Sequence, residues 1–302
     1  GVADRLGIGY KDLSALNPSL VYGSASGFGP KGPDSGRPVL DYVGQARSGL
    51  MWNLGQPGDP PVWTTMAFAD MIAGIMLGYG VVAALAARGR HGVGQKVDVS
   101  HLSSAMWLQY WGMGVSLLTG LGEFPRFGRT QAGNPMWNHY QCADGEWIVL
   151  ALLQGERFWP DFCQAVGRPD LELDPRFLDD ECRFANCREL VAILDQVFVT
   201  KTREEWMTTL GRYKDFLFER VQKTGDLLKD PQVVANGYIG EMDHPSLGRI
   251  KVLNSPFQFS ATPARIPEQP APTLGEHTEE VLRRVAGYND EEIAELAVEG
   301  VV

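Results

Sequence analysis

The stretch ADMIAGIMLGYGVVAALAARGRHGVGQKVDVS (69–100) decides the fold, because it joins a long apolar helix to a strand through a glycine-rich turn. Residues 69–88 predict the helix, and the turn follows at residues 88–95. Residues 96–102 alternate valine with polar side chains, which is typical of a strand. A helix that leads into a strand in this way favours an α/β fold.

The apolar part of this helix also raises the question of a membrane. Residues 71–87 form a run of 17 without a charge, just below the length of about 18–20 that usually spans a bilayer. The run contains Gly74, Gly78, Gly80 and many alanines, which suit a helix that packs closely against its neighbours. We therefore expect a core helix and no membrane span.

Similar elements precede and follow this stretch. Residues 20–29, LVYGSASGFG, predict a buried strand that enters a Gly/Pro-rich loop. Helices are predicted at residues 10–20 and 39–54, and another apolar helix at residues 103–119. The alternation of strands and helices predicts α/β architecture for the first part of the chain.

The pattern changes in the middle of the chain. Residues 139–152, HYQCADGEWIVLAL, predict a hairpin whose tight turn is Asp144-Gly145. The elements expected after it are helices at 155–167, 186–199 and 202–213, a strand within 246–260, a proline-rich linker at 263–272, a helix at 276–287 and a capped helix within 289–302. These elements predict a smaller α+β unit in the middle of the chain.

Composition excludes several classes of protein. The 302 residues carry 27 basic and 37 acidic side chains, and this net charge of −10 argues against a general nucleic-acid binder. The net charge is nevertheless compatible with an anionic small ligand that a few local Arg or Lys side chains bind. The 4 cysteines lack the spacing of a metal site, so we expect free thiols, no metal and a cytoplasmic protein.

Asp70 is the residue most suited to chemistry. It stands directly before the uncharged run, and its position has two interpretations. The carboxylate either caps the helix by accepting backbone N–H bonds, or it is a catalytic group at the head of a buried helix.

Three parts of the chain resemble the class III CoA-transferase (CaiB/BaiF) family, which includes formyl-CoA and carnitine-CoA transferases. They are GVADRLGIGYKDLSALNPSLVYGSASGFGPKGP near the N-terminus, PPVWTTMAFADMIAGIMLGYGVVAALAARGRHGVGQKVDVS in the centre, and HPSLGRIKVLNSPFQFSATPARI with LGEHTEEVL near the C-terminus. Their order and spacing carry the resemblance, which runs from Gly1 to the C-terminal region.

The resemblance implies an activity. The family's A/G-D-x-x-x-G motif reads Ala69-Asp70-Met71-Ile72-Ala73-Gly74 here, which implies that Asp70 attacks the thioester of an acyl-CoA. An aspartyl-acyl anhydride and then an aspartyl-CoA thioester form before a carboxylic acid accepts the coenzyme A. The implied substrates are acyl-CoA and a carboxylic acid, with no cofactor bound covalently at rest.

The resemblance also implies an architecture. It predicts a Rossmann-like large domain that includes residues 1–130, a small α+β domain at 131–230, and a linker with a return to the large domain at 231–302. The family forms interlocked dimers, so a homodimer is expected. It also begins with a βαβ segment of roughly a hundred residues that this sequence lacks, so we expect either a fragment or a second chain that supplies it.

Other site residues follow from the same resemblance. Arg5 matches an arginine that contacts coenzyme A, although it could instead pair with a nearby aspartate on the surface. In the loop 131–135, Gly133 and Asn134 match a region that shields the intermediate in some members; an ordinary inter-domain loop is the alternative. Asn138 and His139 could line the acyl pocket. His91, His101 and His244 are expected to be exposed or hydrogen-bonded.

Two alternative functions remain open. One is a non-catalytic, CoA-binding or structural subunit of a split enzyme. The other is an α-methylacyl-CoA racemase-like enzyme, which needs a histidine-aspartate pair upstream of the shared aspartate. That place is occupied by Leu40-Asp41, and leucine cannot take a proton. Asp41 is therefore expected to have a structural or orienting role.

Overall fold

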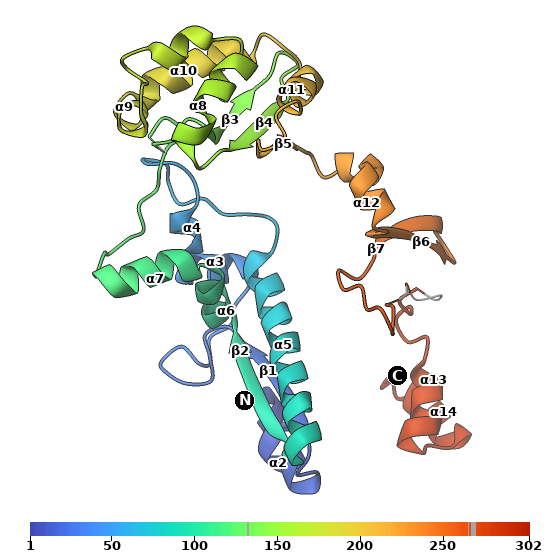
Figure 1. The fold of residues 1–302 in the computed structure, drawn as a ribbon. Coiled ribbons are helices and arrows are strands. Elements are labelled where there is room, and N and C mark those ends of the chain that lie inside the picture. The colour runs from blue at the N-terminus through green and yellow to red at the C-terminus, as the bar shows by residue number, and fades with distance from the viewer. Residues whose placement is uncertain (132, 265, 267–269) are drawn as a thin grey trace. The chain divides into compact units, whose positions relative to one another are not determined.

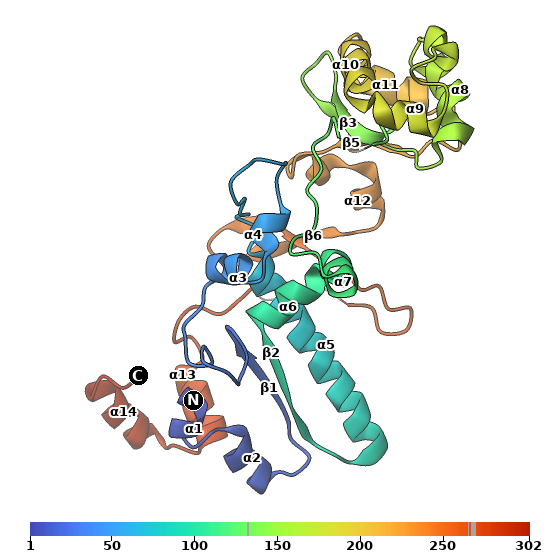
Figure 2. The ribbon, with the colours of Figure 1, turned by 90° about the vertical axis from the view of Figure 1, so that its left-hand side faces the viewer.

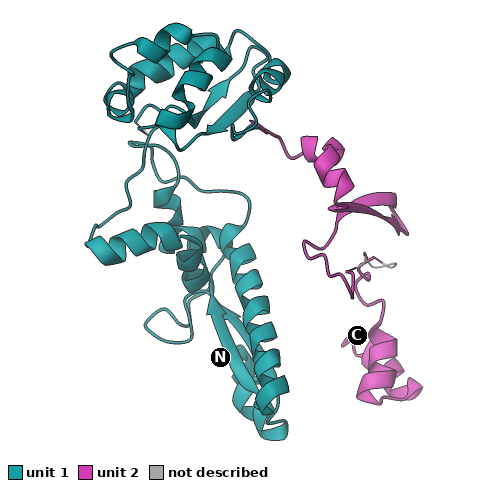
Figure 3. Ribbon diagram, viewed as in Figure 1, with its two compact units in different colours: residues 1–219 teal, residues 220–302 magenta. Residues whose placement is uncertain are grey.

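The computed structural model describes residues 1–131, 133–264, 266 and 270–302. Two compact units make up the chain, residues 1–219 and residues 220–302 (Figure 3). The boundaries expected at residues 130 and 230 stay a prediction.

A parallel strand pair with a crossover helix is the centre of residues 1–128. Strands β1 (Val21–Ser26) and β2 (Gln95–Ser100) pair in parallel, from Val21 opposite Gln95 to Ser26 opposite Ser100. Helix α5 (Phe68–His91) connects them and lies along both strands (Figures 1 and 2). The helix and the two strands expected from the sequence are confirmed.

Small residues bring α5 close to the strands. A Cβ added to Gly80 would lie 2.6 Å from Cγ1 of Val97, and one added to Gly23 would lie 3.2 Å from Val81. Side chains at these positions would push the helix off the strands. The opposite side of α5 is exposed and apolar, with Met71, Ile75, Tyr79 and Val82 at helical spacing. Among the described residues, α5 is the one helix long and apolar enough to cross a membrane.

Shorter helices surround this centre, and two of the expected helices are divided. The predicted helix 39–54 is α3 (Asp41–Arg47) and α4 (Leu50–Asn53), because Gly49 adopts a left-handed φ of +82° between them. The predicted helix 103–119 is likewise divided at Gln109. The remaining helices here are α1 (Val2–Arg5), α2 (Tyr10–Leu16), α6 (His101–Leu108) and α7 (Tyr110–Thr119).

Residues 136–219 form an α+β region with its own core. Strands β3 (Trp137–Gln141) and β4 (Trp147–Ala151) make the predicted antiparallel hairpin. The third strand, β5 (Phe218–Val221), was not predicted. The helices are α8 (Gly155–Ala165), α9 (Asp180–Ala185), α10 (Cys187–Phe198) and α11 (Arg203–Leu210), with a 3-10 turn at Pro169–Leu173.

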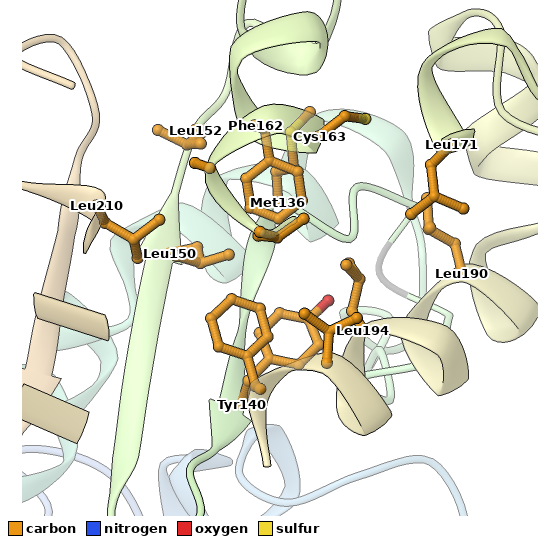
Figure 4. Packing of buried hydrophobic residues seen from close by; sticks show 14 of the residues in the cluster. Met136, Tyr140, Leu150, Leu152, Phe162, Cys163, Leu171, Leu190, Leu194 and Leu210 are labelled. Atoms are coloured by element: carbon orange, nitrogen blue, oxygen red, sulfur yellow. The ribbon is translucent and has the colours of Figure 1, made fainter. Parts of the chain in front are cut away.

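Alternation along the hairpin builds this core. Tyr140 and Leu150 point to the helices and are fully buried, whereas their strand neighbours face outward. Tyr140 stacks on Phe198 with ring centroids 4.6 Å apart. Figure 4 shows these strand residues packed against Phe162 and Leu194 of the helices.

The second unit consists of short elements. Strands β6 (Ile239–His244) and β7 (Gly248–Leu253) form an antiparallel hairpin, of which only the β7 region was predicted. The other elements are a 3-10 turn at Asp226–Lys229, α12 (Pro231–Ala235), α13 (Thr278–Val281) with a π-turn at Leu282–Ala286, and α14 (Asp290–Val298). The predicted cap at Asn289 is confirmed, since it accepts from Glu291 and Glu292. In the predicted linker 263–272, residues 265 and 267–269 lie outside the described residues.

Arg183 is a buried charge in the α+β region. Its side chain is 2 % exposed, donates to the carbonyl of Phe177 at 2.8 Å and to Asp180 at 2.7 Å, and lies over the Trp159 ring. Glu156 provides a further ion pair at 3.0 Å. Buried charges need such partners, so this side chain ties α8 to α9.

We expect Arg183→Met to lower the free energy of unfolding of this region by about 2–4 kcal/mol, because the Phe177 carbonyl and two carboxylates lose their donor. Urea unfolding followed by tryptophan fluorescence measures the loss. The exposed Arg188 on α10 offers a matched control, and Arg188→Met should change the value by about 0.5 kcal/mol or less. Equal effects of the two substitutions would contradict this role for Arg183.

Candidate active site

Asp70 lies in the first turn of α5, and its side chain is 50 % exposed. The helix begins at Phe68, so Asp70 is its third residue rather than its cap. The residue before the helix, Ala67, has a left-handed φ of +49°, which is uncommon for a residue with a side chain. A sharp turn into the helix thus precedes the carboxylate.

The cap of α5 comes from a different helix. Asp41, the first residue of α3, accepts the backbone N–H of Ala69 at 2.8 Å and that of Asp70 at 3.3 Å, both on Oδ1. These are donors that a helix start leaves without a partner inside the helix. The interpretation of Asp70 as the cap is therefore wrong, and its carboxylate is free for another role. Asp41 has the structural role expected of it.

Gln45 fixes Asp41 and the chain that enters α5. Its amide nitrogen donates to the second oxygen of Asp41 and to the carbonyl of Thr64 at 2.9 Å. Its amide oxygen accepts the Thr64 N–H at 3.1 Å. Gln45 is fully buried, so this network lies beneath the surface at which Asp70 is exposed.

His101 is the side chain in contact with the Asp70 carboxylate. Its Nε2 lies 3.0 Å from Oδ1 of Asp70. His101 is the first residue of α6 and directly follows β2. No sequence motif predicts this partner of Asp70. One signal could have found it: side chains that follow parallel strands gather at one edge of the sheet.

Three helices meet at this contact. A Cβ added to Gly44 of α3 would lie 2.9 Å from Cβ of Ala69 and 3.2 Å from Cβ of His101. Gly44 therefore allows α3 to approach the first turns of α5 and α6 together. Figures 1 and 2 show α3 and α6 at the same end of α5. The close approach brings Asp41, Asp70 and His101 into one cluster.

The ring of His101 is held in one orientation. Ser100 caps α6 by accepting the N–H of Ser103 at 3.0 Å, and Ser103 accepts the N–H of Ser100 at 3.2 Å. The Nδ1 atom of His101 is buried, and no donor or acceptor among the described residues reaches it. An ionised carboxylate only accepts hydrogen bonds, so Nε2 carries a proton and donates to Asp70.

A hollow lies at the carboxyl ends of β1 and β2. It is lined by residues 28–31 and 98–100 and by Leu102, Ser103 and Met106. Open α/β sheets bind ligands at this edge. Lys31 and Asp98 both line this hollow, so it presents one group of each charge.

Arg5, by contrast, has no described contact with the cluster. It ends the short helix α1 and is exposed. No hydrogen bond or ion pair of its side chain occurs within the described part of the chain. Its expected contact with coenzyme A stays a prediction.

The four site residues predicted in the α+β region hold local structure. Gly133 has a φ of +78° and lies against Phe184, while Asn134 accepts the N–H of Met136 and donates to the carbonyl of Leu152. Asn138 is buried and donates to the carbonyl of Arg129 at 2.7 Å. No hydrogen bond between these residues and Asp70 occurs among the described residues. Their substrate contacts stay a prediction.

His139 is exposed on β3, and its ring lies 5.4 Å from that of Trp147. Desolvation of the ring by neighbouring atoms, together with the positive charge of Arg129, lowers the pKa of His139. The neutral ring is therefore the form at neutral pH. A neutral ring beside an indole is compatible with the predicted lining of an acyl pocket.

The cysteines do not offer a competing nucleophile. Burial raises the pKa of Cys163 to about 12 and that of Cys142 to about 11, so both stay protonated at neutral pH. The pKa of Cys182 is raised by a hydrogen bond with the Asp179 side chain, and the pKa of Cys187 is raised by burial. Within the described residues, no group of three or more His, Cys, Asp or Glu could hold a metal ion.

Comparison with known proteins gives consistent matches. The model of CoA-transferase family III matches residues 1–278. An (R)-2-hydroxy-4-methylpentanoate CoA-transferase of Clostridioides difficile is 32 % identical over 96 % of this chain and 71 % of its own length. A cinnamoyl-CoA:phenyllactate CoA-transferase of Clostridium sporogenes is 32 % identical over 97 % of this chain and 71 % of its own.

A solved structure shares the fold. A CAIB/BAIF family protein from Brucella suis superposes with a TM-score of 0.82 at 25 % identity, covering 94 % of this chain and 72 % of its own. The crossover from β1 through α5 to β2 therefore belongs to a known α/β fold.

We expect Asp41→Ala to loosen the first turn of α5, because Ala69 and Asp70 lose the acceptor of their N–H groups. Loss of a cap costs about 1–2 kcal/mol. Amide hydrogen exchange at residues 68–72 should then rise by about 5- to 30-fold, as seen by mass spectrometry. Asp41→Asn keeps an acceptor oxygen and should show a smaller rise. Unchanged exchange in Asp41→Ala would refute the capping role.

Proposed function

Because the chain belongs to CoA-transferase family III, we propose that it transfers coenzyme A from an acyl-CoA to a carboxylic acid with Asp70 as the nucleophile. One observation carries the assignment to this residue. Asp70 lies half-exposed at the head of α5, while Asp41 takes over the capping that would otherwise occupy its carboxylate. An ionised carboxylate attacks a thioester without a base to activate it.

The reaction proceeds through two kinds of covalent intermediate. A carboxylate oxygen of Asp70 bonds to the thioester carbon of the donor, and the coenzyme A thiolate leaves with the electron pair of the C–S bond. The thiolate then attacks Cγ of the aspartyl-acyl anhydride and releases the donor acid, which leaves coenzyme A on Asp70. The acceptor acid and the thiolate repeat these steps in reverse order, and the carboxylate of Asp70 is regenerated.

The surroundings of Asp70 support this chemistry. The positive end of α5 favours negative charge at its first turn, where the nucleophile lies. The hollow at the strand ends, whose lining includes Ser100 and Leu102, provides room for part of the substrate. We assign substrate contacts to Arg5, Gly133, Asn134, Asn138 and His139, as expected from the sequence.

The contact with His101 bears on the racemase alternative. A two-base racemase holds the substrate's α-carbon between its bases, so that each can reach the proton from one face. Nε2 of His101 lies 3.0 Å from Asp70, a hydrogen-bond distance that leaves no space for a carbon between them. The geometry thus favours carboxylate nucleophilic catalysis.

We further propose a cytoplasmic homodimer, in line with the sequence expectation. A second chain that supplies a βαβ segment is the other arrangement expected there. The exposed apolar side of α5, with Met71, Ile75 and Tyr79, is a surface that such a neighbour could cover. The half-exposed carboxylate of Asp70, which does not cap α5, favours the catalytic over the non-catalytic alternative.

Trapping with hydroxylamine tests the proposed nucleophile. After incubation with a panel of acyl-CoA donors, mass spectrometry should locate a hydroxamate on Asp70. Asp70→Asn should abolish both the hydroxamate and the transfer of coenzyme A, because the amide cannot form the anhydride. Asp12, an exposed aspartate in the first turn of α2, provides the control, and Asp12→Asn should retain full activity. Transfer at the parent rate by Asp70→Asn would refute the proposal.

A second measurement separates transferase from racemase. With a 2-methylacyl-CoA in deuterium oxide, we expect no deuterium at the α-carbon, since among the described residues no second base faces Asp70 across a substrate carbon. Proton NMR of the recovered thioester reports the exchange. Incorporation of deuterium that Asp70→Asn abolishes would favour the racemase-like alternative.

A further inference from the structure

We propose that His101 is a second catalytic residue. Its Nε2–H stabilises the charge on Oδ1 when a nucleophile attacks Cγ of the acylated Asp70. The inference rests on the proposed function, in which Asp70 carries the acyl group. It adds a hydrogen-bond donor for the steps in which the enzyme's own carbonyl, rather than the substrate's, becomes tetrahedral.

The distance places the donor where the charge develops. Nε2 lies 3.0 Å from Oδ1, within the range in which a donor stabilises an oxyanion. No hydrogen bond to the other oxygen, Oδ2, occurs among the described residues. The two oxygens of Asp70 thus have different surroundings. Oδ2 is the nucleophile, and Oδ1 stays as the carbonyl oxygen of the anhydride and of the thioester.

The donor is preorganised by the fold. The capping box of Ser100 and Ser103 fixes the backbone at His101, and Leu102 donates to the carbonyl of Gly27 at 3.1 Å. Gly44 lies against the Cβ of the histidine. A donor held in this way requires little reorganisation when the charge appears.

The contact has no adequate structural explanation. A contact with a half-exposed carboxylate contributes little to stability, because water competes for both partners. Burial of Nδ1 without a partner among the described residues opposes even this small gain. Such unsatisfied groups gather where function requires them.

The step that His101 assists balances without a proton transfer. The thiolate sulfur bonds to Cγ of the anhydride, and the C=O electrons move onto Oδ1, which accepts the Nε2–H. When the carbonyl re-forms, the bond from Cγ to Oδ2 breaks and the donor acid leaves as a carboxylate that retains this oxygen. The acceptor acid attacks the thioester in the same way and expels the thiolate. His101 keeps its proton throughout.

This sequence has a consequence for the atoms of Asp70. In each full cycle one oxygen of Asp70 leaves with the donor acid, and one oxygen of the acceptor acid replaces it. Oδ1, held by His101, is not exchanged. In a cycle with an acceptor labelled in both carboxyl oxygens with oxygen-18, Asp70 should acquire one labelled oxygen and retain one unlabelled oxygen.

Two substitutions test the role of His101. His101→Phe removes the donor and keeps a ring, whereas His101→Gln places an amide N–H near the position of Nε2. Loss of one oxyanion donor costs about 10²- to 10³-fold in kcat, so we expect that loss in His101→Phe with KM nearly unchanged. His101→Gln should recover most of the rate. The exposed His91 on α5 is the control, and His91→Phe should keep the parent kcat.

Product analysis with hydroxylamine distinguishes chemistry from structure. Hydroxylamine attacks either carbonyl of the anhydride, giving a hydroxamate on Asp70 or a free acyl hydroxamate. Without the donor at Oδ1, attack at Cγ slows, so His101→Phe should form mainly the free acyl hydroxamate. Circular dichroism melting shows whether each variant is folded.

The outcomes separate this inference from the proposed function. If His101→Phe keeps the parent kcat while Asp70→Asn is inactive, the role of His101 is refuted and the nucleophile stands. A loss of rate in both His101 variants with an unchanged ratio of hydroxamates means a structural role, and also overturns the inference. Parent protein that forms no hydroxamate on Asp70, or full transfer by Asp70→Asn, overturns both.

Discussion

The capping of α5 by Asp41 is the constraint on which the site depends. A helix start has four N–H groups without partners inside the helix, and the nearest acidic side chain commonly accepts them. Here the acceptor comes from α3, so the aspartate on α5 itself is left half-exposed. The separation of the two tasks gives one partly buried, hydrogen-bonded carboxylate and one that can react.

Close packing makes this separation stable. Gly44 lets three helix starts meet, and Gln45 connects Asp41 to the segment that turns into α5. The left-handed conformation of Ala67 at that turn costs of the order of 1 kcal/mol, and the surrounding hydrogen bonds maintain it. Strain of this kind is found beside reactive side chains, because the surrounding structure dictates the position of the chain.

Local patterns were sufficient to predict α5, the parallel strands and the β3–β4 hairpin, because apolar periodicity and turn residues determine such elements. They missed the break at Gly49, since a glycine in a helical pattern indicates a left-handed turn only when the neighbouring packing requires one. They also missed β5, which is four residues long. Asp70 was found through a motif, whereas its partner His101 lies 31 positions later and meets it only through the β2–α6 junction.

The hydrogen bond from His101 also determines which steps are assisted. In the free carboxylate the negative charge is shared between Oδ1 and Oδ2, and bond formation at Oδ2 removes charge from Oδ1. The hydrogen bond from His101 therefore stabilises the resting carboxylate more than it stabilises the transition state of the first attack. In the anhydride and the thioester Oδ1 is a neutral carbonyl oxygen, and it gains a full charge when Cγ is attacked. A donor contributes to catalysis only where it binds the transition state more strongly than the state before it. The placement of His101 on Oδ1 thus directs its effect to the turnover of the covalent intermediates, while α5 and the substrate's own contacts must promote their formation.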